Sequence, residues 1–467
     1  MSITGAVMVP HPPLIIPEVG RGQEKAIQAT IDAYHQAARC LAAWKPDTVV
    51  VLSPHSVMYA DYFHISPGTG AEGDFGRFRA PHAKVRVTYD RELVRLICQE
   101  ADRADVPAGT MGEEDRQLDH GTMIPLWFLN QYDRNYQVVR IGLSGLPFSA
   151  HYRLGQCIQR AAERLGKRIA VIASGDLSHR LTKDGPYGYQ EEGPAYDRRI
   201  MDVMGSGEFG GLFDFSEEFC EKAAECGYRS FVIMAGALDS LAVKAERLSH
   251  EGPFGVGYGI CTYEAGGPAP GRDFLRQREE REREALEERK RKEDPYVHLA
   301  RQTIEAWVRG CAGRTEKRIA VPEGLPEEML ARRAGVFVSL KVDGRLRGCI
   351  GTISPVRGSI AEEIMENAIS AACRDPRFHP VEPEELDRLV YSVDVLGKTE
   401  EISSKEELDV KRYGVIVSRG ARRGLLLPNL EGVDTVEEQI DIARQKAGIP
   451  EDAENIRLER FEVVRHF

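Results

Sequence analysis

The sequence predicts two domains: an α/β sandwich around a central, largely parallel sheet, followed by an α+β domain. Three observations predict this arrangement. The chain has 467 residues, more than one ordinary domain contains. Short β-branched segments alternate with amphipathic helical segments over residues 1–265. A segment dense in charged residues then separates this part from residues 295–467, where hairpin signals dominate.

The overall composition excludes several classes of protein. The chain carries 62 Lys and Arg against 73 Asp and Glu, a net charge of −11, which argues against non-specific binding to nucleic acid or anionic membranes. The N-terminus lacks the features of a signal peptide, and the longest apolar stretch, residues 231–238, is too short to span a membrane. The 9 cysteines include no Cys-x-x-Cys pair, so a disulfide framework or structural zinc knuckle is not expected. We therefore expect a cytoplasmic protein with no nucleic-acid or membrane partner.

In the first domain, four short β-branched runs bounded by turn residues predict strands at 5–9, 48–52, 137–143 and 168–173. Between them, apolar residues at helical spacing predict amphipathic helices, for example Ile27, Ile31, Tyr34, Ala38 and Leu41. Strands that alternate with helices favour a parallel sheet covered by helices.

The segment 272–294 marks the boundary between the domains. Of its 23 residues, 18 are charged, with nine of each sign. Glu279 and Arg283 are spaced four apart, which supports an exposed helix. The preceding residues 266–271 contain only Gly, Pro and Ala and predict a loop. We therefore expect domains at 1–265 and 295–467 joined by a charged helical linker at 266–294, with a charged surface helix inside one domain as the alternative.

The second domain combines helical and hairpin signals. Residues 296–309 predict a helix. Val342-Asp343-Gly344 predicts a turn between strands at 336–341 and 345–350, and residues 420–424 predict another between 415–418 and 425–427. This mixture predicts an α+β domain.

Histidines follow three of the predicted strands in the first domain. His11 follows the strand at 5–9, His55 the strand at 48–52 and His179 the strand at 168–173. His120 opens a further predicted helix, which includes residues 123–129. Because ligands bind beyond the carboxyl ends of parallel strands, we expect these imidazoles around one crevice. The histidines without such a placement are interpreted as structural or exposed: His35, His64, His82, His151, His250, His298 and His466.

Two neutral imidazoles and one carboxylate, with coordination positions left open, suit non-haem Fe(II) and oxygen. Further histidines then act as acid and base. Glu225 is a candidate carboxylate because it precedes the apolar helix predicted at 231–238, although a charge favoured by the helix start is an equally weighted interpretation. Cys226 is an alternative ligand, and Glu221 and Asp176 are further candidates.

An ordered set of motifs in the first domain resembles a known enzyme family. The motifs are His11-Pro12-Pro13, Ser53-Pro54-His55, Leu118-Asp119-His120-Gly121, Ser174-Gly175-Asp176-Leu177-Ser178-His179 and Met234-Ala235-Gly236-Ala237-Leu238. Together they resemble the catalytic B subunit of class III extradiol ring-cleavage dioxygenases, a superfamily that also contains the Memo-like proteins.

The resemblance implies roles for individual residues. His11 and His55 match the histidine ligands of the iron, and Glu225 approximately matches its carboxylate ligand. His179 matches the acid–base histidine, and His120 a second active-site histidine. In Memo-like relatives the place of the carboxylate resembles a cysteine, which points to Cys226 and to another metal, copper or zinc.

The second domain resembles the AMMECR-one family from about residue 294 to residue 467. The motifs are Leu346-Arg347-Gly348-Cys349-Ile350-Gly351-Thr352 and Arg374-Asp375-Pro376-Arg377-Phe378. This resemblance implies a fold and little chemistry, but its fusion to a Memo- or dioxygenase-like domain often occurs in systems that include a radical-SAM protein. Nearby Arg345 and Arg347 can activate the Cys349 thiol, yet we favour simple packing between two glycines because no histidine base is near in sequence.

The leading hypothesis is Fe(II)-dependent extradiol cleavage of a catechol-type aromatic by O2, with a C-terminal accessory domain. The rival hypothesis is a Memo-like metal-binding protein that works with a radical-SAM partner in a modification system and does not cleave rings. A scaffold with a vestigial metal site is the third alternative. We expect a small aromatic substrate, O2 and Fe(II) as ligands, and assembly into a homo-oligomer.

Overall fold

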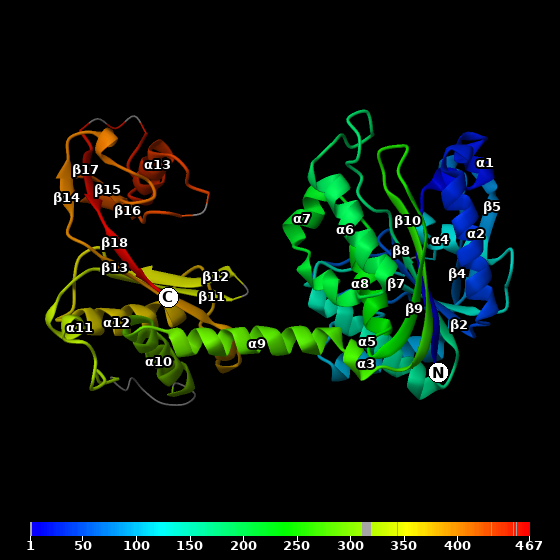
Figure 1. Ribbon diagram of the computed structural model, residues 1–467, viewed down its shortest axis with the longest axis horizontal. Helices are drawn as coiled ribbons and strands as arrows, with labels where there is room; N and C mark the ends of the chain where they lie inside the picture. The colour runs from blue at the N-terminus through cyan, green and yellow to red at the C-terminus, as the bar shows by residue number, and fades with distance from the viewer. Residues whose placement is uncertain are drawn as a thin grey trace. The chain divides into compact units, whose positions relative to one another are not determined.

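The computed structural model describes residues 2–114, 116–310, 319–342, 344–430, 432–451, 453 and 455–467. The chain divides into two compact units, Met1–Glu280 and Arg281–Phe467, and most of their helices and strands are labelled in Figure 1. Asp343 of the expected hairpin turn and the cysteine at position 311 lie outside the described residues.

The first unit is built on a six-stranded sheet with the order β7-β2-β8-β1-β10-β9. Its strands are β1 (Ile3–Val9), β2 (Thr48–Ser53), β7 (Gln137–Gly142), β8 (Ile169–Ser174), β9 (Leu241–Glu251) and β10 (Tyr258–Pro268). Strands β7, β2, β8 and β1 pair in parallel, while β10 and β9 extend the sheet antiparallel. The four strands expected from the sequence thus form the parallel part, and the sheet is mixed but mostly parallel. Strands β9 and β10 were not predicted from the sequence.

Helices cover both faces of this sheet. Alternate strand residues enter two separate hydrophobic cores: Val50 lies in one, whereas Val49 and Val51 lie in the other. The first core is completed by α3 (Arg91–Arg103), α5 (Phe148–Leu165), α6 (Glu192–Ser206) and α8 (Tyr228–Ala237). The second is completed by α2 (Gln28–Ala43) and α4 (His120–Leu129). Burial on both faces explains why the parallel strands are continuously apolar.

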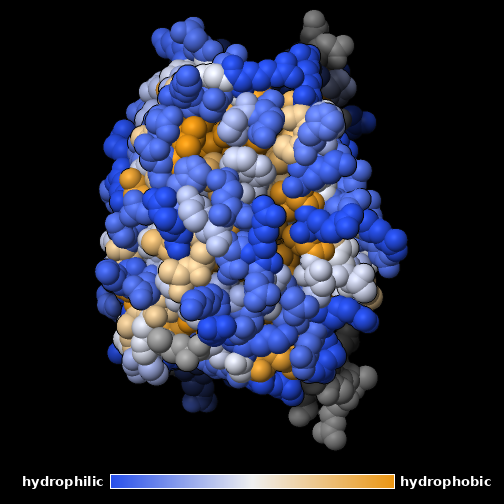
Figure 2. All heavy atoms as spheres, turned by 90° about the vertical axis from the view of Figure 1, so that its right-hand side faces the viewer, coloured by the Kyte–Doolittle hydropathy of each residue, from blue (hydrophilic) through white to orange (hydrophobic). Residues whose placement is uncertain are grey.

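The remaining α-helices and strands of the first unit lie outside the six-stranded sheet. They are α1 (Pro17–Gly20), β3 (Phe63–His64), β4 (Gly70–Phe75), β5 (Ala80–Thr88), β6 (Ala108–Gly109) and α7 (Glu217–Ala223). Strand β4 pairs antiparallel with β5, and β3 pairs in parallel with β6. The face shown in Figure 2 is mostly hydrophilic, and its apolar areas lie in separate patches.

The second unit contains two four-stranded sheets, with orders β12-β11-β13-β18 and β14-β17-β15-β16. Their strands are β11 (Val336–Val342), β12 (Arg345–Gly351), β13 (Val390–Leu396), β14 (Glu400–Ile402), β15 (Gly414–Arg419), β16 (Arg422–Leu426), β17 (Arg457–Phe461) and β18 (Val463–His466). Its helices are α10 (Pro295–Gly310), α11 (Glu327–Ala331), α12 (Ile360–Cys373) and α13 (Val436–Lys446). Helices α10 and α12 pack against the first sheet and α13 against the second. The predicted α10 helix and both hairpins, β11–β12 and β15–β16, are confirmed.

The charged segment forms the helix α9 (Phe274–Lys292), but the expected start of the linker at residue 266 is wrong. Strand β10 continues to Pro268, so the expected loop is partly strand. Phe274 and Leu275 are only 8% and 4% exposed and belong to the first unit's core. Two apolar residues suffice to anchor the start of an otherwise polar helix, because burying each contributes about 1.5–3 kcal/mol.

None of the helices in the described part of the chain is both long and apolar enough to cross a bilayer.

Candidate metal centre

The candidate site lies where adjacent parallel strands of the first unit end. Strand β1 leads into His11, β2 into His55 and β8 into Asp176 and His179. The backbone N–H of His11 donates to Asp176 Oδ1 at 2.8 Å, and that of Gly175 donates to the Val9 carbonyl at 3.0 Å. Because β8 lies between β1 and β2, the sheet itself brings these loops together.

The structure brings His11, His55 and His120 into direct contact. The Nε2 atoms of His11 and His55 are 3.0 Å apart. The His120 ring stacks on His55, with centroids 4.1 Å apart, and meets His11 edge-on at 5.2 Å. His11 is buried while His55 is exposed, so one side of the cluster faces solvent.

Cys226 lies with these three histidines. Its Sγ is 3.6 Å from His11 Nε2, and ligand atoms of His11, His55 and Cys226 all lie within 4.8 Å of one another. A second set within the same limit joins Cys226 to Asp176 and His179. The two sets share the cysteine, so they form one cluster.

Two glycines allow Cys226 to reach the histidines. A Cβ on Gly175 would lie 2.0 Å from the Gly227 Cα, so the loop after β8 touches the loop before α8 backbone to backbone. The N–H of Gly227 donates to the Asp176 carbonyl at 3.1 Å, and the N–H of Asp176 donates to Cys226 Sγ at 3.3 Å. This close contact requires glycine on both sides.

Glu225, the residue predicted to supply the carboxylate ligand, lies outside both ligand sets among the described residues. Its Oε2 accepts hydrogen bonds from the Tyr228 N–H at 2.5 Å and from the Tyr196 hydroxyl at 3.4 Å. Burial raises the pKa of Glu225 to about 7. These contacts match the alternative interpretation of a carboxyl group at a helix start. Glu221, the other acidic candidate there, is exposed on α7.

Burial keeps the central imidazoles neutral. It lowers the pKa of His11 to about 3, with a further contribution from His55. It also lowers the pKa of His120 to about 3, assisted by His11 and His55. Burial acts oppositely on acids, raising the pKa of Asp176 to about 6 and that of the Cys226 thiol above its usual value. Neutral imidazoles have free lone pairs, the form that binds metals.

The arrangement fits one bound cation. Two lone pairs that face each other at 3.0 Å repel unless a proton or a cation lies between them. Metal–nitrogen bonds of about 2.1 Å at right angles would place two nitrogen ligands about 3.0 Å apart. The Nδ1 of His11 lies 2.9 Å from Ser174 Oγ, a contact that orients the ring as outer hydrogen bonds to metal-binding histidines do.

A buried polar network next to His55 was not predicted from the sequence. Ser53 Oγ donates to Asp119 Oδ1 at 2.5 Å and accepts from the His55 N–H at 3.2 Å. Arg140, fully buried in β7, has its Nη1 3.8 Å from Asp119 Oδ2. Burial opposes the charge of Asp119, but hydrogen bonds from Ser53 and Thr122 and the charge of Arg140 hold its pKa below the usual value. The sequence feature that could have predicted this network is an arginine inside an apolar strand, because a buried charge requires a buried partner.

His179 lies at the edge of the cluster. Its Nδ1 is buried and has no hydrogen-bond partner in the described part of the structure, while its ring meets Tyr187 edge-on with centroids 5.1 Å apart. The Tyr187 side chain is 60% exposed. An imidazole beside the ligand set, with one nitrogen unsatisfied, is placed to accept or donate a proton.

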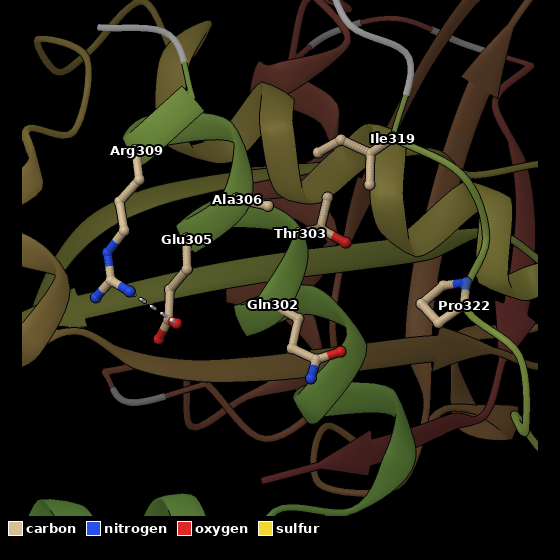
Figure 3. Close-up of a pocket in the computed structure, with 7 residues that line it drawn as sticks. All are labelled: Gln302, Thr303, Glu305, Ala306, Arg309, Ile319 and Pro322. Carbon is tan, nitrogen blue, oxygen red and sulfur yellow. Dashed lines mark ion pairs between the residues drawn. The ribbon is translucent and has the colours of Figure 1, made fainter.

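A cavity of about 420 Å³ occurs in the second unit and has a different character. Figure 3 shows its lining, which consists of α10 side chains together with Ile319 and Pro322. Its acidic group, Glu305, forms an ion pair with Arg309 at 3.9 Å. A carboxylate neutralised in this way is a weak metal ligand, so we place the candidate centre at the histidine cluster.

Relatives of the chain match both units. Protein CA_C1420 of Clostridium acetobutylicum is 41% identical over 100% of this chain and 99% of its own. A Thermotoga maritima protein is 54% identical over 37% of this chain and 98% of its own. The solved structure of uncharacterized protein JW3007 from Escherichia coli K12 has 14% identity and a TM-score of 0.38, covering 56% of this chain and 99% of its own. That of uncharacterized protein PH0010 from Pyrococcus horikoshii has 35% identity and a TM-score of 0.33, covering 36% and 88%.

Two family models match in the order that the motifs predicted. The model of AMMECR1 matches residues 297–466. The model described as the catalytic LigB subunit of aromatic ring-opening dioxygenase matches residues 5–261, the stretch that contains every residue of the histidine cluster. The chain therefore belongs to the family of the catalytic LigB subunit of aromatic ring-opening dioxygenase, with an AMMECR1 domain fused behind it.

Proposed function

We propose that the first unit is a metal-binding domain whose ion is held by His11, His55 and Cys226. The observation that carries this proposal is the meeting of one thiol and two imidazole nitrogens within 4.8 Å. Thiolate together with imidazole suits copper or zinc, and a set of two histidines and one cysteine is typical of copper. The Memo-like hypothesis therefore fits this donor set better than the dioxygenase hypothesis does.

Copper, when bound, would supply one-electron redox chemistry. The chain's own residues would orient the ligands and handle protons. Ser174 orients His11, while Asp119 acts through Ser53 on the His55 backbone. His179, with an unsatisfied Nδ1 beside Asp176, would move a proton to or from a molecule that enters at the exposed His55 side.

Extradiol cleavage of a catechol-type substrate with Fe(II) and O2 is the second candidate function. The match of residues 5–261 to ring-opening dioxygenases favours it. This chemistry suits two histidines and a carboxylate. Asp176 meets that need better than Glu225, because its carboxylate lies with His179 and Cys226. Under this function, Cys226 would not be a required ligand.

Metal analysis of anaerobically purified protein separates the two candidates. We expect copper or zinc in the natural chain, loss of most of it in Cys226→Ala, and full retention in the control Glu225→Gln. The same proteins are then given a panel of catechols and watched for yellow ring-opened product. Bound iron that survives Cys226→Ala, together with ring opening that Asp176→Asn abolishes, would overturn the copper proposal and support the dioxygenase.

Two further predictions are that the chain works with a radical-SAM partner and that it assembles into a homo-oligomer. Under the proposed function, a radical-SAM partner would act with this chain in a modification system. Co-purification of the full chain with such a protein, and the molar mass of the chain in solution, test these two predictions separately.

A further inference from the structure

The turn that carries His179 is held in place through the buried residue before it, Ser178. The Ser178 Oγ donates to the Ala223 carbonyl at 2.8 Å, and the Ser178 carbonyl accepts from the Gly257 N–H at 2.8 Å. The Ser178 N–H donates to Asp197 Oδ1 at 2.9 Å. Because His179 follows directly, its place beside the ligand set depends on how Ser178 is held.

Asp197 brings a carboxylate from α6 to this turn. Its side chain is only 3% exposed, and a Cβ on Gly257 would lie 2.0 Å from its Oδ2. Glycine at position 257 thus lets the carboxylate reach the backbone of the turn. An ionised carboxylate at this depth is costly unless hydrogen-bond donors surround it. Asp197 therefore needs a donor on Oδ2 as well as the Ser178 N–H on Oδ1.

His250 supplies that second donor from β9. Its Nε2 lies 3.1 Å from Asp197 Oδ2. Its Nδ1 lies 3.4 Å from Nη2 of Arg247, a guanidinium that can only donate hydrogen bonds. The Nδ1 therefore accepts, and the proton of the neutral imidazole is on Nε2, where it faces Asp197. In the part of the chain that the structure describes, the ion pairs of Asp197 include no other basic side chain.

We propose that Asp197 and His250 are positioning residues for His179. This inference rests on the proposed function, in which His179 moves a proton at the metal centre. The Nδ1 of His179 has no hydrogen-bond partner among the described residues, so the backbone largely decides where this ring lies. Asp197 fixes that backbone through Ser178, and His250 fixes Asp197. The pair thus acts on the proton-transferring residue from a helix and a strand outside the ligand set.

Two substitutions at position 250 separate hydrogen bonding from packing. Leucine leaves Oδ2 of Asp197 without a donor, so the carboxylate favours an orientation towards water and the Ser178 N–H loses its acceptor. The turn then moves more freely, and the buried Nδ1 of His179 becomes accessible. Glutamine has a similar volume to leucine but keeps an N–H donor for Asp197. A role in hydrogen bonding therefore predicts different results for the two variants, whereas a role in packing predicts the same result.

Reaction of the full chain with diethyl pyrocarbonate tests the proposal. This reagent acylates accessible neutral imidazoles, and peptide mass spectrometry reads the rate at each histidine. The rate at His179 is compared with that at the exposed His82, while the buried His151 reports unfolding. His250→Leu should raise the His179-to-His82 rate ratio at least about fivefold, since losing a hydrogen bond to a buried charge shifts a local equilibrium by more than that factor. His250→Gln should restore the ratio of the natural chain.

Further variants show whether the two residues act through one contact. Lys244→Leu, at an exposed position of the same strand, is the matched control and should leave the ratio unchanged. Asp197→Ala should raise the ratio as His250→Leu does. The double variant should show no further increase, because both substitutions break the same chain of hydrogen bonds. In all of these proteins His151 should stay unreactive, and if Asp197→Ala fails to fold, the leucine and glutamine variants of His250 decide.

An unchanged ratio in His250→Leu, or equal ratios in the leucine and glutamine variants, would overturn the proposal. Reaction of His151 in His250→Leu would overturn it too, because the histidine would then support the fold as a whole. Metal content keeps this test apart from that of the proposed function. A natural chain without metal would contradict the metal centre and leave the His179 ratios unaffected. Loss of metal in His250→Leu alone would show that the pair supports the ligands and not His179.

Discussion

The histidine cluster of the first unit and the group of polar contacts around Cys349 in the second unit are built in opposite ways. In the first unit, His11 and His55 follow the parallel strands β1 and β2, which lie on either side of β8 and whose carboxyl ends meet at one edge of the sheet. In the second unit, Cys349, Asp375 and Arg377 come from a hairpin strand and from the loop that follows α12. Parallel topology concentrates functional groups at one place, whereas antiparallel hairpins do not, and this difference decides which site can be found from sequence alone.

The largest expected effect is loss of the metal. His11→Ala or His55→Ala should lower metal affinity by at least about 100-fold, because even residues that only support a ligand cost 10–100-fold. His82→Ala, an exposed histidine on β5, is the matched control and should keep full occupancy. Metal content and titration of the purified variants measure this. If both ligand variants retained their metal, the strand ends would not form the centre.

The next largest effect, on the free energy of unfolding, is expected for substitutions in α9 near the boundary between the units. Phe274→Ala removes a buried ring from the first core and should cost about 3–5 kcal/mol of unfolding free energy. Leu286→Ala, further along α9 and not buried, should cost less than about 1 kcal/mol. Hydrogen exchange on the full chain should show faster exchange in first-unit peptides only. Equal losses in both units would mean that they unfold together.

A substitution in the polar network next to His55 should lower metal affinity less than a substitution of a metal ligand does. Asp119→Asn removes the charge that Ser53, Thr122 and Arg140 stabilise, and should weaken metal binding by about 10–100-fold. Asp61→Asn, at an exposed aspartate of the same unit, is the control. Metal titration measures both. An unchanged affinity in Asp119→Asn would show that the network supports the fold and not the site.

The smallest expected effect is a difference between the two units in how acid changes their stability. Burial lowers the pKa of His151 in the first unit to about 3, below its ordinary value, so its stabilising contribution is complete above about pH 6.5 and is lost as the pH falls towards 3. One proton changes stability by at most about 1.4 kcal/mol per pH unit. In the second unit, the pKa of Asp375 is lowered chiefly by its hydrogen bond from Arg377, so that contribution is lost only below about pH 3.9.

Unfolding curves between pH 7 and 4 measure this difference. The first unit should lose stability over that range, because the lowered pKa values of three histidines (His11, His120 and His151) outweigh the opposing raised pKa values of Glu225 and Asp176. The second unit should not lose stability over the same range. His151→Phe, which keeps a ring against Phe63, should reduce the pH dependence of the first unit by the contribution of His151, while those of His11 and His120 remain. If the second unit lost stability at a higher pH than the first, the role given to the buried His151 would be contradicted.

The first unit was largely predictable because its strands are short, apolar and followed by histidines. Strands β1, β2, β7 and β8 lie where the sequence predicts them. Strand β9 was missed because its residues are only partly buried and largely polar, and β10 because it runs into a Gly- and Pro-rich segment that resembles a loop.

The site was predictable only in part, for a physical reason. Position after a strand places His11 and His55 near the crevice, but it does not say which way neighbouring side chains point. Glu225 and Cys226 are adjacent in sequence, and only the packing of Gly175 on Gly227 turns the thiol to the histidines and leaves the carboxylate at the helix start. Asp375 and Arg377 are likewise joined to Cys349 by tertiary contacts alone.

The most direct test of the metal centre is X-ray absorption spectroscopy at the metal edge of the metal-loaded full chain. The structure predicts one sulfur ligand, at about 2.3 Å if the ion is zinc, together with imidazole nitrogens at about 2.0–2.1 Å. In Cys226→Ala the sulfur contribution should vanish, whereas in Glu225→Gln the spectrum should stay unchanged. A coordination sphere of nitrogen and oxygen alone in the natural chain, altered by Glu225→Gln and not by Cys226→Ala, would contradict the assignment of His11, His55 and Cys226 as the metal ligands.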